Sequence, residues 1–153
     1  LKVLNKYNNW RAVVAGNEPR EKYNFKHKNL KIYSWLPHNK ILKLYNDSSI
    51  SVVPSRWEEP FGRTSMESAA HGCATITSNR GGLLETFDND LFLKKLNSNE
   101  LFRKIDFLIQ NPKKLKFYQF KNFRNPKHII ENLVIFLDSV KLNLFSFNCF
   151  FYR

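Results

Sequence analysis

The sequence predicts an α/β fold in which a parallel sheet is flanked by helices. Short apolar runs alternate with stretches of helical character through the first half of the chain. The apolar runs have the length of buried strands, and strands that alternate with helices pair in parallel through right-handed crossovers. A chain of 153 residues can bury one ordinary core. We therefore expect one domain over residues 1–144, followed by an apolar segment at 145–153 that fits a docking tail, a crossing segment or an unstructured end.

The first elements follow from apolar runs and their boundaries. Residues 1–9 are typical of a helix end or a connector. Residues 10–15, with two adjacent valines and a following Gly16, predict a buried strand. Residues 29–33 predict the next strand. Apolar side chains at 41, 42, 44 and 45 predict that residues 38–46 form a helix with one buried face.

The chain continues to alternate between strands and helices up to residue 77, and its later predicted elements are helices. Strands are predicted at residues 50–53 and 73–77, with a helix at 64–71 between them. Residues 99–110 predict a helix that the Asn111-Pro112 pair breaks. Apolar residues at helical spacing predict a long helix over residues 129–144.

The turn between the strand at 50–53 and the helix at 64–71 has the features of a binding site. The first turn of a helix presents N–H groups without intrahelical partners and carries the positive end of the helix dipole. Gly62 allows a ligand to approach the backbone closely. Glu59 and Glu67 bracket the turn, and carboxylates accept hydrogen bonds from sugar hydroxyls. This combination fits a ligand with anionic and polyhydroxyl parts.

The same residues carry a resemblance to a known family. Glu59-Pro60-Phe61-Gly62, followed by Glu67, resembles the E-x7-E signature of retaining glycosyltransferases with the GT-B fold, in particular family four. Further matches surround it in the family's order over about residues 10–87: Gly16, Tyr33-Ser34-Trp35-Leu36-Pro37, Leu44-Tyr45-Asn46, Pro54-Ser55, His71-Gly72 and Gly81-Gly82-Leu83-Leu84-Glu85. The resemblance implies the Rossmann-like, donor-binding C-terminal half of a GT-B enzyme, which transfers a hexosyl group with retention from a nucleoside diphosphate sugar.

The resemblance also implies roles for the residues of this turn. Glu67 would accept hydrogen bonds from the ribose of the donor. Glu59 would lie near the transferred sugar as the catalytic glutamate, with an orienting or charge-stabilising role. The backbone amides of Phe61, Gly62 and Arg63 would contact sugar and phosphate. For the Arg63 side chain, a phosphate contact and plain surface charge remain equal alternatives.

Two other segments receive binding roles from the resemblance. Ser34, Trp35 and Leu36 would line the nucleobase, although Trp35 could equally pack on a neighbouring helix. Gly81 and Gly82 would lie near the diphosphate or the sugar, because adjacent glycines can turn successive N–H groups toward an anion.

No metal or further cofactor is expected. The sequence has no Asp-x-Asp motif, and its four histidines lack metal-ligand spacing. Cys73 and Cys149, the only cysteines, suggest neither a zinc site nor a disulfide, and Cys73 fits a small core residue. His71, beside Gly72, fits a helix cap rather than a catalytic base. The resemblance therefore implies metal-free chemistry with the nucleotide sugar as co-substrate.

The resemblance implies that parts of the family's enzyme lie outside this sequence. Relatives place an Arg and a Lys that grip the diphosphate upstream of the position of Trp10. Their N-terminal domain binds the acceptor, which would be a glycan, a lipid or a lipopolysaccharide. We therefore expect a fragment, a split subunit or a degraded gene product that binds donor weakly and transfers sugar poorly or not at all by itself.

The charge supports a rival interpretation. The net charge is +12, and residues 113–121 interleave lysines with aromatic side chains. A non-catalytic basic module that binds nucleic acid or an anionic membrane would explain both observations. Lysine stems over apolar surface explain the same residues without a partner, so we do not favour nucleic acid. With no secretory signal and no membrane-length apolar run, we expect a cytoplasmic protein, compatible with peripheral contact at the inner membrane face.

Overall fold

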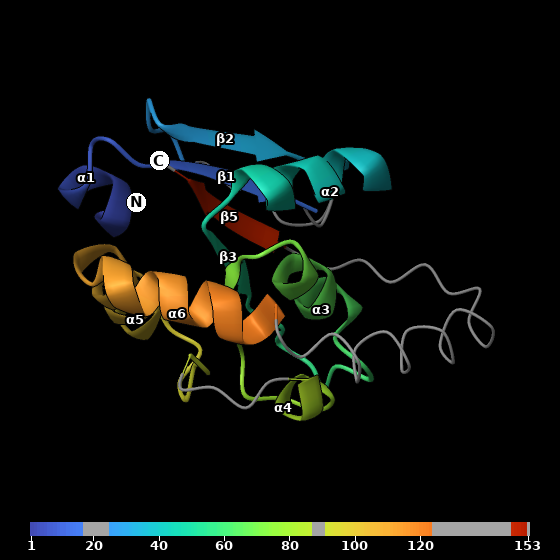
Figure 1. The fold of residues 1–153 in the computed structure, drawn as a ribbon. Helices are drawn as coiled ribbons and strands as arrows, with labels where there is room; N and C mark the ends of the chain where they lie inside the picture. The colour runs from blue at the N-terminus through green and yellow to red at the C-terminus, as the bar shows by residue number, and fades with distance from the viewer. Residues whose placement is uncertain (17–24, 87–90, 124–147, 153) are drawn as a thin grey trace.

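A five-stranded sheet in the order β2-β1-β5-β3-β4 forms the centre of the molecule (Figure 1). The computed structural model describes residues 1–16, 25–86, 91–123 and 148–152. The five strands are β1 (Arg11–Ala15), β2 (Leu30–Tyr33), β3 (Ile50–Val53), β4 (Ala74–Thr77) and β5 (Asn148–Tyr152). The α/β class predicted from the sequence is thus confirmed.

The four strands predicted from the sequence run in one direction, and a fifth strand outside that prediction is antiparallel to them. β1 is parallel to β2, and β3 is parallel to β4, whereas β5 is antiparallel to both β1 and β3. β1, β2, β3 and β4 therefore all run in one direction, and β5 runs against them. The sheet is mixed because its central position is filled by a segment from the far end of the sequence.

β5 is formed by residues from the apolar segment predicted at 145–153. Phe150 is opposite Val13 on β1 and Ser51 on β3, and its side chain is fully buried. Phe151 is buried on the other face of the sheet. Residues 148–152 thus form a core strand, which none of the three alternatives considered for this segment included.

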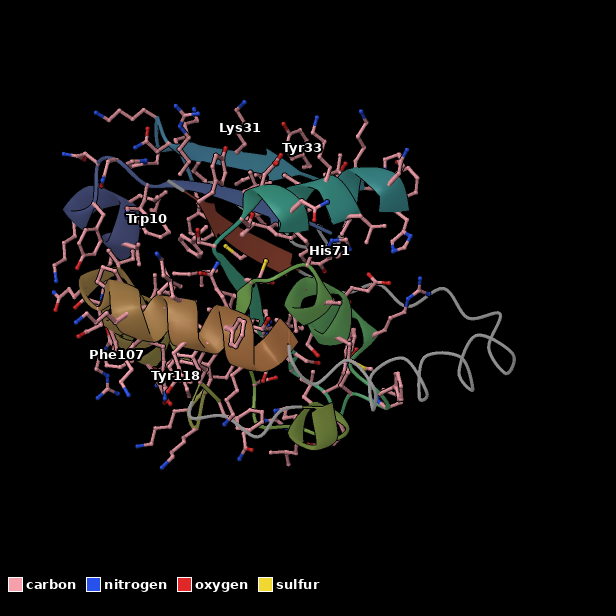
Figure 2. The ribbon with its side chains drawn as sticks, viewed as in Figure 1. Trp10, Lys31, Tyr33, His71, Phe107 and Tyr118 are labelled. Carbon is pink, nitrogen blue, oxygen red and sulfur yellow. The ribbon has the colours of Figure 1, made fainter. Side chains whose placement is uncertain are left out.

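Helices cover both faces of the sheet. One face packs against α1 (Lys2–Lys6), α5 (Ser98–Gln110) and α6 (Pro112–Phe123), with Trp10 buried beside α1 (Figures 1 and 2). The other face packs against α2 (His38–Asp47). The helix α3 (Arg63–Ala70) is hydrogen-bonded to β4 through the buried hydroxyls of Ser68 and Thr75, which lie 2.8 Å apart. The short helix α4 (Leu83–Thr86) follows the glycine pair. These layers bury the apolar faces that the helical periodicity predicted.

The last helices differ from the sequence prediction. Pro112 ends α5 as predicted, but a new helix begins at Pro112 itself, because the fixed φ of proline suits the first helical position. The helix predicted over 129–144 lies outside the described residues. No helix in the described ranges is long and apolar enough to span a bilayer.

The strand directions bring the expected loops to one edge of the sheet. Because β1 to β4 run in the same direction, their carboxyl ends lie at a common edge, where Gly16, Ser34, Pro54 and Ser78 follow the four strands in turn. In α/β sheets, ligands bind outside this edge. The segments singled out in the sequence therefore lie where the fold offers a binding site.

Candidate functional site

The turn between β3 and α3 depends on Gly62. This residue caps α3 with φ of +74°, in the left-handed region that glycine adopts without strain. A Cβ at Gly62 would lie 2.7 Å from Leu83 Cδ2, so the Leu83 side chain would have to shift to accommodate it. The Ser65 hydroxyl donates to the Gly62 carbonyl at 2.6 Å. α3 therefore starts at Arg63, one residue before the predicted start, with its positive end at the carboxyl edge of the sheet.

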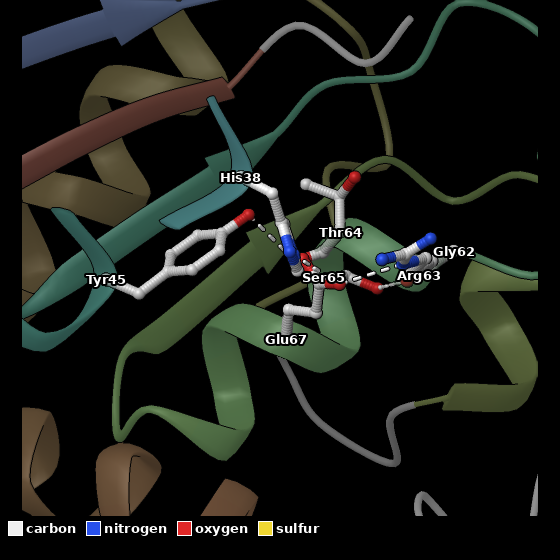
Figure 3. A network of polar contacts seen from close by, with 7 residues as sticks. All are labelled: His38, Tyr45, Gly62, Arg63, Thr64, Ser65 and Glu67. Carbon is white, nitrogen blue, oxygen red and sulfur yellow. Dashed lines mark hydrogen bonds and ion pairs between the residues drawn. The ribbon is translucent and has the colours of Figure 1, made fainter. Parts of the chain in front are cut away.

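The carboxylate of Glu67 is the centre of a polar network (Figure 3). Arg63 Nε donates to Glu67 Oε1 at 2.8 Å, and His38 Nε2 lies 3.0 Å from the same oxygen. The Glu67 side chain is only 14% exposed, whereas Arg63 and His38 lie at the surface. The Arg63 guanidinium is an i,i+4 partner of Glu67, and the two interpretations of this side chain, a phosphate contact and plain surface charge, both stay predictions.

His38 is a member of this network that sequence reasoning missed. It begins α2 and follows the predicted nucleobase segment directly, but it lies 29 positions from Glu67. No local signal connects two residues at that separation. Only the packing of α2 beside α3 brings the imidazole to the carboxylate.

The Arg63 and His38 side chains leave one side of the Glu67 carboxylate available. A carboxylate offers about four lone-pair sites on its two oxygens. Oε1 is occupied by Arg63 and His38, and no hydrogen bond from the described part of the chain reaches Oε2. The network thus orients the carboxylate and leaves Oε2 as an acceptor.

Tyr45 contacts the first turn of α3 from the side of α2 (Figure 3). Its hydroxyl donates to the Thr64 carbonyl at 3.2 Å. Burial, and secondarily the negative charge of Glu67, raise the pKa of Tyr45 well above its usual value. The phenol therefore stays neutral at physiological pH and remains a hydrogen-bond donor.

Glu59 has a different environment from Glu67. Its side chain is buried, and its Oε2 accepts hydrogen bonds from Trp57 Nε1 at 2.6 Å and Ser55 Oγ at 3.2 Å. The carboxylate therefore closes the loop that precedes α3. Sequence reasoning missed both donors, although Trp57, only two positions away, was an available signal. The neighbouring Glu58 is exposed and pairs with Arg80 at 3.1 Å.

The glycine pair packs directly against the Glu59 loop. Gly82 N–H donates to the Glu59 carbonyl at 2.6 Å. A Cβ at Gly81 would lie 2.5 Å from the Glu59 carbonyl oxygen, and one at Gly82 would lie 2.6 Å from the Pro60 carbonyl oxygen. Both glycines are therefore required for close backbone contact between the two loops. Their predicted place near the donor's diphosphate stays a prediction.

The predicted nucleobase segment lies at the same edge of the sheet. The Trp35 side chain is 67% exposed, which argues against packing on a neighbouring helix. Ser34 is exposed as well, whereas Leu36 packs against the core cluster under α2. The segment leads through Pro37 into His38, so it connects sequentially to the Glu67 network.

His71 and the two cysteines have contacts that fit roles in stability. His71 is the C-cap residue of α3, as predicted, and its Nδ1 lies 2.7 Å from Asn46 Oδ1. Cys73 and Cys149 are both free, and burial raises the pKa of each thiol to about 12. Within residues 1–16, 25–86, 91–123 and 148–152, no group of three or more His, Cys, Asp or Glu side chains could hold a metal ion.

Comparison with known proteins identifies the family of this chain. Glycogen synthase of Mycobacterium tuberculosis strain H37Rv is 43% identical over 54 residues, which cover 35% of this chain and 13% of that protein. Spore coat protein SA of Bacillus subtilis strain 168 is 44% identical over 48 residues, or 31% of this chain and 13% of that protein. The matches thus span a small part of each relative. Residues 1–124 match the model of the family described as glycosyl transferases group 1. The chain therefore belongs to this glycosyltransferase family.

Proposed function

We propose that this chain binds the donor in a retaining hexosyltransferase that uses a nucleoside diphosphate sugar. The observation that carries the proposal is the oriented carboxylate of Glu67 at the carboxyl edge of the sheet. Ribose hydroxyls are hydrogen-bond donors, and Oε2 of Glu67 is an acceptor held at low exposure. Arg63 and His38 then act as positioning residues for ribose recognition.

The start of α3 supplies the complementary part of the site. The amides of Phe61, Gly62 and Arg63 precede or open the helix, where the helix dipole favours an anion. In sugar transfer, the bond between the sugar and the diphosphate breaks, and the diphosphate leaves with additional negative charge. Fixed N–H groups and the helix dipole would stabilise that charge without a metal ion.

In our proposal, Glu59 contributes to sugar transfer indirectly, by fixing the loop that precedes α3. Its hydrogen bonds to Trp57 and Ser55 fix the backbone that leads into α3. The glycine pair then holds the same loop from the other side through the bond from Gly82 to Glu59. The acceptor would be a glycan, a lipid or a lipopolysaccharide bound by a further domain, since the relatives are much longer than the matched segments.

The experiment is calorimetric titration of the chain with UDP, GDP, ADP and their common sugar conjugates. We expect one nucleotide to bind selectively. Because hydrogen bonds to a charged group contribute about 1.5–3 kcal/mol each, Glu67→Ala should weaken binding roughly 10- to 100-fold. Addition of EDTA should leave the affinity unchanged.

Glu58→Ala is the matched control, because it removes an exposed glutamate one residue from the Glu59 loop closure. It should retain parental affinity. Parental affinity in Glu67→Ala would disprove the ribose assignment. No nucleotide binding by the folded parent chain would contradict the proposal that this chain binds the donor.

A further inference from the structure

One side of α6 combines exposed aromatic side chains with lysines. Phe117 is 52% exposed and Phe120 is 55% exposed, although phenylalanine is among the residue types most often buried. The helix contains no Asp or Glu. We name its exposed side the aromatic–lysine face, which consists of Lys113, Lys114, Lys116, Phe117, Phe120 and Lys121.

The helical positions of these residues form an ordered pattern. At about 100° of rotation per residue, Phe117 and Phe120 lie about 60° apart. Lys113 projects between them, Lys116 projects on one side of the pair, and Lys121 projects on the other. The two rings therefore form the crest of the helix, and positive charges flank them.

The opposite side of α6 is held in the core. Tyr118 is buried in the cluster under the sheet, and Leu115 packs against the same cluster. Tyr118 also contacts Phe117 edge-on, with ring centroids 5.3 Å apart, and Lys114 Nζ lies 5.7 Å from the Phe117 centroid. The aromatic–lysine face is therefore presented outward by a fixed helix. Figure 2 shows nitrogen-tipped side chains that project from the α5 and α6 side, away from the sheet.

We propose that the aromatic–lysine face docks this protein onto an anionic lipid bilayer. Interfacial helices place aromatic side chains among the acyl chains and keep lysines at the anionic headgroups. A protein partner fits less well, because lysine is depleted from protein interfaces. Nucleic acid fits less well too, because single strands bind along charged grooves with stacking platforms, whereas this face is the convex side of a helix. This inference does not depend on the proposed donor site.

The test is flotation of the whole chain with lipid vesicles. We expect binding to phosphatidylcholine vesicles that contain about 30% phosphatidylserine, little binding to pure phosphatidylcholine, and weaker binding at high salt. Phe117→Ala combined with Phe120→Ala should lower the partition coefficient by roughly tenfold or more. Lys113→Gln combined with Lys116→Gln should lower it by a similar factor. The melting temperature checks that each variant folds.

The controls separate this face from the overall charge of +12. Lys40→Gln combined with Lys43→Gln removes the same charge from exposed positions on α2, and Phe25→Ala removes an aromatic ring with 54% exposure. These variants should bind within about twofold of the parent, since their residues lie outside the face. Equal losses in the control and α6 variants would overturn the proposal, as would absence of vesicle binding. Binding to single-stranded RNA in place of vesicles would overturn it in favour of nucleic acid.

Discussion

Two glutamates eight positions apart occupy different environments. Glu59 is buried and bonded within its own loop, whereas Glu67 is held by side chains from two helices and retains an oxygen without a bond in the described residues. A carboxylate that closes a loop contributes mainly to stability, whereas one with a remaining acceptor can recognise a ligand. We therefore propose that Glu59 positions the loop and that Glu67 binds the ligand.

Replacement of Glu59 should destabilise the protein. Glu59→Ala leaves the Trp57 and Ser55 donors without their acceptor, which should lower the free energy of unfolding by about 1–3 kcal/mol. Urea denaturation measures this loss, and Trp57 fluorescence should change in the native state. Glu58→Ala should cost less than about 1 kcal/mol, because its ion pair with Arg80 is exposed. Equal costs for the two variants would contradict the loop-closing role.

The buried thiol of Cys73 should make stability depend on pH. Burial raises its pKa from 9.0 to about 12, so the native state keeps a proton that the unfolded chain loses. This contribution is complete below pH 9 and is lost as the pH rises toward 12. The free energy of unfolding of the parent should therefore fall more steeply over this range than that of Cys73→Ala. Parallel pH profiles for the two proteins would show that the thiol is not buried.

At the scale of elements, the site depends on two loops that contact each other through their backbones. The loop before α3 and the turn before α4 meet at the Gly82 N–H and the Glu59 carbonyl. Neither loop has room for a side chain at the contact. The glycine pair therefore positions the Glu59 loop whether or not it also contacts a ligand.

Gly82→Ala should be more destabilising than Gly72→Ala. An added Cβ at Gly82 would meet the Pro60 carbonyl oxygen at 2.6 Å, whereas one at Gly72 meets nothing within 4 Å. Gly72 has φ of +80°, so its replacement costs only backbone strain, about 1 kcal/mol. Forced separation of the two loops at Gly82 should cost about 1–3 kcal/mol in urea unfolding. The reverse order would mean that the loops move apart without penalty.

At the scale of the whole molecule, β5 joins two pairs of parallel strands into one sheet. β1 and β2 form one pair, β3 and β4 form the other, and both pairs bond to β5 rather than to each other. Residues 148–152 thus complete the core between strands that all lie within residues 11–77.

Phe150→Ala should therefore destabilise the entire fold. Phe150 is fully buried and contacts Tyr45 in a tilted arrangement with ring centroids 5.1 Å apart. Loss of such a side chain costs about 3–5 kcal/mol, which is a large part of the stability of a small domain. Thermal unfolding measures the effect. Tyr152→Ala, at a partly exposed position on the same strand, should cost clearly less, and equal costs would contradict the central placement of β5.

The sequence by itself determined the strand, turn and helix from Ile50 to Ala70, and it identified Glu59, Gly62 and Glu67 within them. These features depend on local properties: the length of an apolar run, the backbone freedom of glycine and the exposed amides of a helix start. Only the tertiary structure decided that His38 and Arg63 share one oxygen of Glu67, that Glu59 turns into its own loop, and that β5 runs antiparallel through the centre of the sheet. The physical reason is that the pairing of strands and side chains far apart in the chain depends on the whole packed core, which no local pattern encodes.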